Sequence, residues 1–579
     1  MMRITKKLHY MGSKIKRKMI SLTKWGPDRY VYLGEKERLC KNYREAVLFI
    51  QKGLEKYPGN PELNKVLAKV HAQKKDWQKA VLCWHVYFTR KPQTGSISDF
   101  EQAVIACEKA KDFTAMDMMI EKGVEQYPDN IKLNKMYYQA AMDSSNWETA
   151  VKRLEQFIEN FQKECSYHES IMLSVMKQLV GDHATAKRLL EQTIDAHAEE
   201  LNNDDKGYQK IRLFDNGETV IDFYKQLRAS SKVIVTFDSI NKVLKKPPFG
   251  FKVLNEQKLD IIAVRKRKGG TYQQDLSKTD FESATQTLLS GYDDKIAYGY
   301  SLGAYLALYL TSELNCRILA LSPRISPHPK YGKKKVIEKE PFNHDVDISE
   351  NPAISPIIVF DPKSKMDAKY VNGAFKKAFP NGRFIEIPYA GHGMARHLLN
   401  MKMLKDYIIS FINNDAVPKY NRKHKSKSSI YFRLLAKECL KRNKLKWSEI
   451  LVNRSLEMVP DDVHAIKVKI DLHDEIGGHS DTSLALETAI KRKPKQIKFR
   501  LMLIDHLLAQ GKLDQALKQI NQSFDIFGRK AQLVTREKQI DEMMQEQLVT
   551  RSTADNSTDG IAYKGSVNEE MTKPTSIPL

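Results

Sequence analysis

Apolar positions recur at helical spacing along residues 36–200, and the pattern repeats with a nearly constant step. An aromatic or histidine residue is followed three positions later by a small or apolar one, at steps of 34, 36, 34 and 36 residues, beginning at Tyr43, Trp77, Phe113, Trp147 and His183. Prolines, which end helices, lie between these steps at Pro58, Pro92 and Pro128. One helix pair cannot bury its apolar stripe alone, so the period predicts four or five stacked pairs.

A second helical stretch, residues 429–548, shows the same features. Pro460 and Pro494 are 34 residues apart, and Trp447 and the segment 511–516 (GKLDQA) provide further positions of the pattern. In period, both stretches resemble the tetratricopeptide repeat, in which each unit is two antiparallel helices. The resemblance implies a concave face that binds a partner protein or presents a polymer.

Between the two helical stretches the period changes, and short runs of β-type residues alternate with helical segments. Strands are expected over 209–214, 219–223, 232–237, 259–264, 295–298, 316–321, 354–360 and 383–387. Helices are expected over 280–290, 302–314, 368–379 and 394–412. Alternation of this kind predicts an α/β domain with a doubly wound, mostly parallel sheet covered on both faces.

These patterns divide the chain into six parts: a basic N-terminal arm (1–35), helical repeats (36–200), the α/β domain (205–415), a basic linker (416–428), C-terminal helical repeats (429–548) and a disordered tail (549–579). The first 25 residues carry eight Lys or Arg and no acid. A basic amphipathic arm can lie on a membrane surface, and a disordered basic tail is the alternative.

The candidate chemistry is concentrated where a strand runs directly into a helix, in the segment 295–310 (KIAYGYSLGAYLALYL). Gly299 and Gly303 stand two residues before and after Ser301, which matches the G-x-S-x-G pattern of a nucleophile elbow. Side chains at the two glycine positions are expected to collide across the bend. The pattern predicts an exposed serine hydroxyl, backed by the first amides of a helix that can stabilise negative charge.

With this elbow on its fifth core strand, the region 205–415 resembles an α/β-hydrolase. The resemblance implies a Ser, acid, His order along the chain, with Ser301 as nucleophile and His392, in a glycine-flanked loop after the last strand, as base. His397, on the following helix, is the weaker alternative base. Two acids compete for the third position: Asp367, which the resemblance favours, and Asp361, which directly follows a strand.

The resemblance also implies an oxyanion site. The amide of Leu302 is one expected donor, and the loop that begins at Phe237 and Asp238 is expected to supply the other, although the usual His-Gly is replaced there by Phe-Asp-Ser-Ile. Arg324 and Tyr305 are candidate substrate contacts. No phosphate-binding glycine loop or metal-ligand cluster accompanies these residues, so no cofactor or metal is implied.

Composition narrows the possible classes of protein. The 579 residues carry a net charge of +24, but the basic residues are mixed with 71 acidic ones. The sequence also shows no signature of a nucleic-acid-binding fold, so anionic lipid or glycan is favoured over nucleic acid as a binding partner. Six widely spaced cysteines without a C-x-x-C pair fit neither a disulfide framework nor a zinc site and favour the reducing cytoplasm. No apolar run reaches membrane-spanning length.

The sequence therefore predicts a cytoplasmic serine hydrolase, an esterase or deacylase, with peripheral membrane contact through its N-terminal arm as an option. Its repeats would recruit it to a partner or a polymer, by analogy in surface-polysaccharide production. The alternative is a non-catalytic interaction scaffold with a degenerate hydrolase domain.

Overall fold

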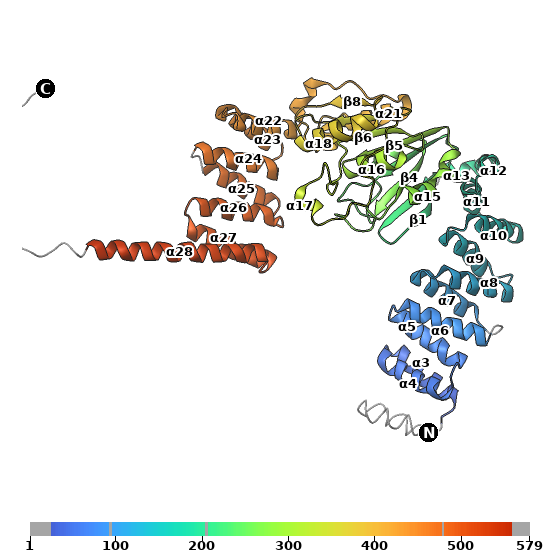
Figure 1. Ribbon diagram of the computed structural model, residues 1–579. Coiled ribbons are helices and arrows are strands. Elements are labelled where there is room, and N and C mark those ends of the chain that lie inside the picture. The colour runs from blue at the N-terminus through green and yellow to red at the C-terminus, as the bar shows by residue number, and fades with distance from the viewer. Residues whose placement is uncertain (1–24, 92–94, 203–206, 477–479, 559–579) are drawn as a thin grey trace, which may run out of the picture. The chain divides into compact units, whose positions relative to one another are not determined.

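The computed structural model describes residues 25–91, 95–202, 207–476 and 480–558 (Figure 1). Most of the expected basic arm and the last part of the expected tail lie outside these residues. The chain divides into two compact units. The first holds the N-terminal repeats and the sheet, and the second holds the C-terminal repeats together with the loops 360–365 and 386–407.

The N-terminal repeats are five helix pairs, coloured blue to teal in Figure 1. The pairs are α3 (Pro27–Leu39) with α4 (Tyr43–Lys56), α5 (Pro61–Gln73) with α6 (Trp77–Arg90), α7 (Ile97–Ala110) with α8 (Phe113–Gln126), α9 (Ile131–Asp143) with α10 (Trp147–Asn160), and α11 (Tyr167–Leu179) with α12 (His183–Ala196). A short helix, α13 (Ala198–Asn202), follows them. Each residue that marks the sequence period begins the second helix of a pair.

The repeat pattern is explained by packing, because the residue three positions into each second helix is buried. Neighbouring pairs are joined by stacked rings, such as Phe88 on α6 and Phe100 on α7, whose centroids lie 4.4 Å apart. The region is thus a tetratricopeptide-like helical repeat. It begins earlier than the expected residue 36, because Tyr30 and Leu33 of α3 are buried in its core.

Ion pairs 34 residues apart also join adjacent repeats. The Lys65 ammonium lies 2.6 Å from the Asp99 carboxylate, and the Lys135 ammonium lies 3.0 Å from that of Glu169. Both acids are the third residue of their helices, where they complete capping boxes with a preceding serine. Each acid therefore stabilises its own helix start and holds the preceding repeat against it.

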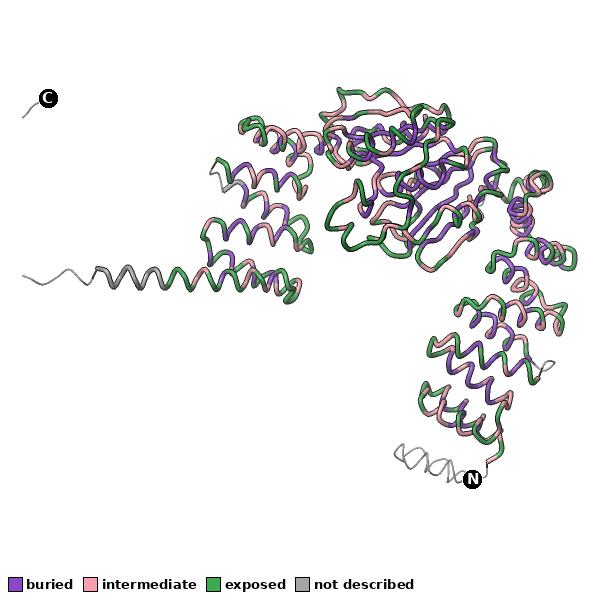
Figure 2. The backbone as a smooth tube through the Cα atoms, viewed as in Figure 1, coloured by how far each residue is buried: buried purple, intermediate pink, exposed green. Residues whose placement is uncertain are grey.

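An eight-stranded mixed sheet follows the repeats, in the order β1-β2-β4-β3-β5-β6-β7-β8. The strands are β1 (Tyr208–Asp215), β2 (Thr219–Gln226), β3 (Lys232–Phe237), β4 (Asp260–Lys266), β5 (Asp294–Tyr300), β6 (Arg317–Leu321), β7 (Ile357–Phe360) and β8 (Arg383–Glu386). β1, β2 and β4 pair antiparallel, and the pairs from β4 to β7 are parallel. Every expected strand is present, and Figure 2 shows that most of the sheet is buried.

The last strand is also parallel to its neighbour. The Arg383 N–H donates to the Pro356 carbonyl and the Ile387 N–H to the Phe360 carbonyl, both at 2.9 Å. The two bonds step along β7 and β8 in the same direction, so β7 and β8 end at the same edge of the sheet.

Helices and loops lie between and after the strands, and those within residues 386–407 belong to the second unit. The helices are α14 (Phe251–Leu254), α15 (Lys278–Ser290), α16 (Leu302–Thr311), α17 (Lys334–Ile337), α18 (Lys365–Tyr370), a short π-helix (Val371–Phe375), α19 (Lys376–Ala378), α20 (Met394–Asn400) and α21 (Leu404–Asn414). The expected single helix over 394–412 is wrong, because Lys402 has a left-handed backbone (φ 60°) that separates α20 from α21.

The second unit holds the C-terminal helices, which follow a short 3-10 helix (Arg422–Lys427) within the expected linker. They are α22 (Ser429–Lys441), α23 (Leu445–Met458), α24 (Val463–Ile476), α25 (Ser480–Arg492), α26 (Ile497–Ala509), α27 (Leu513–Phe527) and α28 (Ala531–Thr558). Trp447 is 61% exposed, so Leu445 and the buried Ser448, rather than Trp447, occupy the pattern positions. α28 runs past residue 548, where a disordered tail was expected.

In the part of the chain described, no helix combines the length and apolarity needed to cross a bilayer.

Candidate functional site

Ser301 occupies a sharp bend between β5 and α16. Its backbone has φ 58° and ψ −117°, a left-handed conformation that is strained for a residue with a side chain. An added Cβ at Gly299 would overlap the Gly303 carbonyl and lie 2.5 Å from the Ala304 nitrogen. The prediction that glycine is needed before the bend is therefore confirmed.

Gly303 is needed for a different reason from the one expected. A Cβ on Gly303 would overlap the Phe237 carbonyl at the end of β3, rather than collide across the bend. The first turn of α16 thus lies directly against the end of β3. This close approach places the loop after β3 beside the serine.

The backbone around Ser301 is fixed on both sides. The Ser301 N–H donates to the Leu321 carbonyl at 2.9 Å, and the Ser301 carbonyl accepts from the Tyr305 N–H at 3.1 Å and the Arg324 N–H at 3.3 Å. Leu302 is the first residue of α16, so its N–H is one of the helix-start amides that have no partner within the helix. The expected oxyanion donor Leu302 therefore lies directly beside the serine.

Asp367, the favoured acid, lies in the first turn of α18 and is fully buried. Its carboxylate accepts a hydrogen bond from Arg324 Nη1 at 3.1 Å. The Arg324 side chain is 17% exposed, so this is a largely buried ion pair. The guanidinium predicted to contact substrate and the carboxylate predicted to orient the histidine are thus paired with each other.

Asp361, the alternative acid, follows β7 directly and is 1% exposed. One carboxylate oxygen accepts from the Lys363 N–H at 2.8 Å, and the other accepts from the Gly391 N–H at 2.7 Å. Gly391 has a left-handed backbone (φ 63°) and precedes His392. The Asp361 carboxylate therefore holds the loop that carries the candidate base.

His397, the weaker candidate base, is fully buried in α20. Its Nδ1 lies 2.8 Å from the Ser428 hydroxyl, and its Nε2 lies 3.3 Å from the Tyr420 hydroxyl. Burial lowers the pKa of His397 to about 4. Both ring nitrogens of His397 are therefore within hydrogen-bond distance of buried or half-buried hydroxyls. His392, in the loop after β8, is the better candidate for the base.

Asp238 does not fit an oxyanion role. Its N–H donates to the Val264 carbonyl at 3.1 Å, and its carboxylate accepts from the Phe249 N–H at 3.1 Å. Arg265 Nε lies 3.5 Å from the same carboxylate, and burial raises the pKa of Asp238. Phe237 is the last residue of β3 and is fully buried. The Asp238 amide is thus bound to β4, and the donor role expected of Asp238 does not fit its geometry.

Tyr305 does not fit a substrate contact. Its side chain is 1% exposed, and its ring stacks with those of Tyr309 and His344 at centroid distances of 5.7 and 5.8 Å. Burial raises the pKa of the Tyr305 hydroxyl. Tyr305 therefore packs the segment between β6 and β7, which carries His344, against α16.

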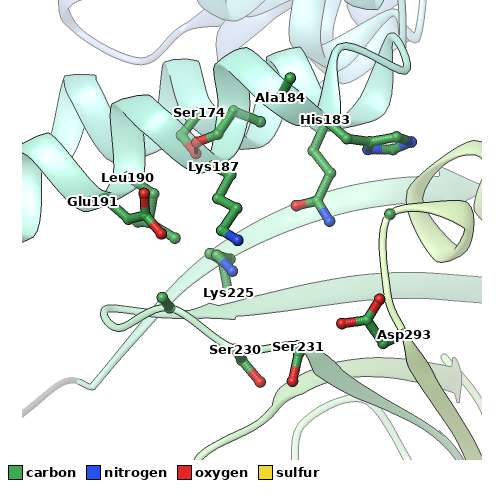
Figure 3. Close-up of a pocket in the computed structure, with 14 residues that line it drawn as sticks. Ser174, His183, Ala184, Lys187, Leu190, Glu191, Lys225, Ser230, Ser231 and Asp293 are labelled. Atoms are coloured by element: carbon green, nitrogen blue, oxygen red, sulfur yellow. Dashed lines mark hydrogen bonds between the residues drawn. The ribbon is translucent and has the colours of Figure 1, made fainter.

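A cavity of about 560 Å³, which sequence reasoning missed, lies between the last N-terminal repeat and the sheet (Figure 3). Lys187 of α12 and Lys225 of β2 reach into it, and Ser231 and Asp293 line its other side. Ser231 and Asp293 come just before β3 and β5, so the cavity lies at the sheet edge opposite to Ser301. The Lys225 ammonium is bound to the buried Asp260 carboxylate at 2.6 Å, so Lys225 has a structural partner inside the sheet domain.

Within the described ranges, no group of three or more His, Cys, Asp or Glu side chains is arranged so that it could hold a metal ion.

No family model matches the chain, and no curated protein matches it. Among solved structures, Naa15/Naa10 bound to HypK-THB is 11% identical over 92% of this chain and 68% of its own, with a TM-score of 0.35. YrrB, described as a TPR protein with an unusual peptide-binding site, is 12% identical over 30% of this chain and 87% of its own (TM-score 0.25). MamA from Desulfovibrio magneticus RS-1 is 14% identical over 30% of this chain and 96% of its own (TM-score 0.24).

Proposed function

We propose that this chain is a serine hydrolase of the α/β-hydrolase type, which cleaves an ester through an acyl-enzyme. The observation that carries the proposal is the backbone of Ser301, held at φ 58° between a strand and a helix by close contacts at two glycines. Strain of this kind persists only where the surrounding structure enforces it, and it concentrates at functional sites.

The sheet topology supports the proposal. Ser301 follows β5, Asp361 follows β7 and His392 lies in the loop after β8, three parallel strands of one sheet. The carboxyl ends of parallel strands meet at one edge, which is where ligands bind in α/β folds. The order along the chain is the one that α/β-hydrolases use.

In the proposed reaction, the Ser301 oxygen attacks the ester carbonyl carbon while His392 takes the hydroxyl proton. The Leu302 amide stabilises the oxyanion that forms. The imidazolium then returns its proton to the alcohol oxygen as the carbon–oxygen bond breaks. Water, deprotonated by the same imidazole, hydrolyses the acyl-enzyme.

We assign the orienting acid to Asp361 rather than to Asp367. Asp361 binds the amide of Gly391, next to the candidate base, whereas Asp367 is the partner of Arg324. A carboxylate that fixes the histidine loop can also fix the tautomer of the imidazole. Moving Asp367 to this role would leave a buried guanidinium without its partner, at a high desolvation cost.

The repeats are proposed to bind a protein segment or to present a polymer, such as an ester-bearing glycan. A stack of helix pairs forms an extended concave surface, which such proteins use for binding. YrrB, with its peptide-binding site, is one protein with this kind of repeat. Peripheral membrane contact through the basic N-terminal arm (1–35) is part of the same proposal, and most of that arm lies outside the described residues.

Labelling by a fluorophosphonate probe tests the hydrolase. The wild type is expected to be labelled, and Ser301→Ala to lose labelling. Ser322→Ala is the matched control, because Ser322 also follows a parallel strand and also has a left-handed backbone (φ 47°). Labelling that survives Ser301→Ala, or is absent from the wild type, would refute the hydrolase.

A non-catalytic interaction scaffold is the second candidate. The replacement of the usual His-Gly after β3 favours it, since Asp238 is engaged in the loop and cannot supply the missing amide. The same labelling experiment separates the two candidates, because a scaffold predicts no Ser301-dependent labelling.

A further inference from the structure

Two buried cations on β4 hold the loop that follows β3. The Lys266 side chain is fully buried, and its ammonium donates to the carbonyls of Ser239 at 3.0 Å, Ile240 at 2.8 Å and Thr271 at 3.3 Å. Arg265, the preceding residue, donates to the Val243 and Lys246 carbonyls. Burying a lysine is costly unless its donors are satisfied, and an ammonium has three donors for three carbonyls.

The direction of these carbonyls sets the direction of the next amides. In a trans peptide the N–H points away from the C=O. Holding the Ser239 and Ile240 carbonyls toward the Lys266 ammonium therefore turns the N–H groups of Ile240 and Asn241 away from that ammonium. The loop itself follows β3, which pairs with β5, the strand that ends directly before Ser301.

These two amides are also available. Within the described residues, the N–H groups of Ile240 and Asn241 donate to no protein acceptor, whereas the Asp238 N–H is bound to Val264. The contact between Gly303 and the Phe237 carbonyl brings this loop next to the start of α16. An amide from Ile240 or Asn241 is thus in the right region to complement the Leu302 amide.

We propose that Lys266 is a positioning residue of the hydrolase: by binding the carbonyls of Ser239 and Ile240, it directs the following amides toward the oxyanion that forms at Ser301. The inference rests on the proposed function and replaces the donor expected at Phe237 or Asp238. Lys266 itself does not touch the reacting atoms. It acts through the orientation of two peptide groups.

The charge state of Lys266 provides a distinctive test. Burial lowers its pKa to about 8, and the nearby Asp238 carboxylate opposes that change. The same Asp238 carboxylate also interacts with Arg265 on β4 and with Lys242 in the loop. Deprotonation leaves two N–H donors for three carbonyls, so the loop should loosen and activity should fall above about pH 8.

The effect on stability has the opposite sign. Between pH 8 and the ordinary lysine value of 10.5, the unfolded chain still binds this proton, whereas the folded chain has released it. The contribution of Lys266 to folding stability therefore rises with pH in this window. Alkaline loss of activity from this group would not arise from unfolding.

The experiment compares wild type, Lys266→Met, Lys266→Arg and Lys232→Met. Lys232→Met is the matched control, because the Lys232 ammonium also contacts a backbone carbonyl, that of Ile412, but it lies at the start of β3. The readouts are the rate of Ser301-dependent fluorophosphonate labelling, and kcat and KM for a nitrophenyl ester, from pH 6 to about pH 10.

We expect Lys266→Met to lower kcat by about 10²-fold with little change in KM, as for loss of an oxyanion donor. Lys266→Arg should restore most of kcat and lose the decline above about pH 8, because a guanidinium does not titrate there. Lys232→Met should match the wild type. If Lys266→Met does not fold, the comparison of wild type with Lys266→Arg decides the matter.

Two results would overturn the inference. Wild-type labelling that depends on Ser301, together with unchanged kcat and pH profile in Lys266→Met or Lys266→Arg, would refute the role of Lys266 and leave the hydrolase intact. Absence of Ser301-dependent labelling in the wild type would refute the hydrolase and this inference together.

Discussion

Replacing Gly299 with alanine is the most direct test of the elbow geometry. The new Cβ would overlap the Gly303 carbonyl and lie 2.5 Å from the Ala304 nitrogen, where real Cβ atoms keep at least 3.0 Å. The bend must therefore open by at least 0.5 Å. Its neighbours are backbone atoms, which cannot move aside as a flexible side chain can.

Overpacking of this kind costs about 1–3 kcal/mol. A cost of that size speeds local opening by about 5- to 150-fold, since 1.4 kcal/mol is a factor of ten. Catalysis should suffer separately, because a displacement near 1 Å at a reacting group costs about 10²-fold in rate. Gly299→Ala is thus expected to lower both the local stability of the elbow and the labelling rate of Ser301.

Hydrogen exchange measured by mass spectrometry on peptides spanning β5 and α16 gives the local stability. All five tryptophans lie outside 205–415, so their fluorescence reports independently that the repeats are intact. Gly393→Ala is the control, because Gly393 has an ordinary backbone (φ −75°) and its Cβ would meet only Ile430 Cδ1 at 3.6 Å. Exchange and labelling within twofold of wild type in Gly299→Ala would refute the close-contact argument.

The remaining predictions concern three acids. Asp361→Asn should lower kcat/KM by about 10⁴-fold, as loss of an orienting carboxylate does. Asp367→Asn should mainly destabilise the sheet domain, by about 2 kcal/mol, because Arg324 loses its partner. Ester kinetics and hydrogen exchange compare the two variants, and a larger loss of kcat/KM in Asp367→Asn than in Asp361→Asn would restore Asp367 as the acid. For Asp99, burial raises the pKa, but hydrogen bonds from Lys65 and Ser96 outweigh burial and leave the pKa below 3.8. Its ion pair should therefore stabilise the N-terminal repeats above about pH 4 and be lost as the pH falls through the lowered pKa. Asp99→Asn should remove this part of the pH dependence of the free energy of unfolding, which is measured by tryptophan fluorescence during urea unfolding. An unchanged pH dependence in the variant would contradict the role of the pair.

Local sequence patterns were enough to predict the helices and strands, because apolar residues recur at helical spacing along each helix pair and β-type residues cluster in each strand. The elbow at Ser301 was predictable for the same reason, since its two glycines lie within two residues of the serine in the sequence. The break at Lys402 was not, because apolar residues continue across it at helical spacing.

The choice between the two acids depended on partners distant in sequence. Asp367 is bound by a residue 43 positions away, and Asp361 by an amide 30 positions away. Nothing near either acid in the sequence identifies these partners. The buried Lys266 was missed because a cation at the end of a strand, in a basic run, gives the same sequence pattern whether it is buried or solvated.

The stack of five helix pairs makes different contacts at its α3 end and at its α12 end. At the α12 end, the His183 ring lies 3.0 Å from the Ser290 hydroxyl of α15, which ties the last pair to the sheet domain. The α3 end, among the described residues, packs only on the pairs that follow it. In a linear array, unravelling starts where neighbours are fewest. Denaturant or a pulling force should therefore peel the pairs in one direction, from α3 toward the sheet, so that the pair next to the sheet melts last.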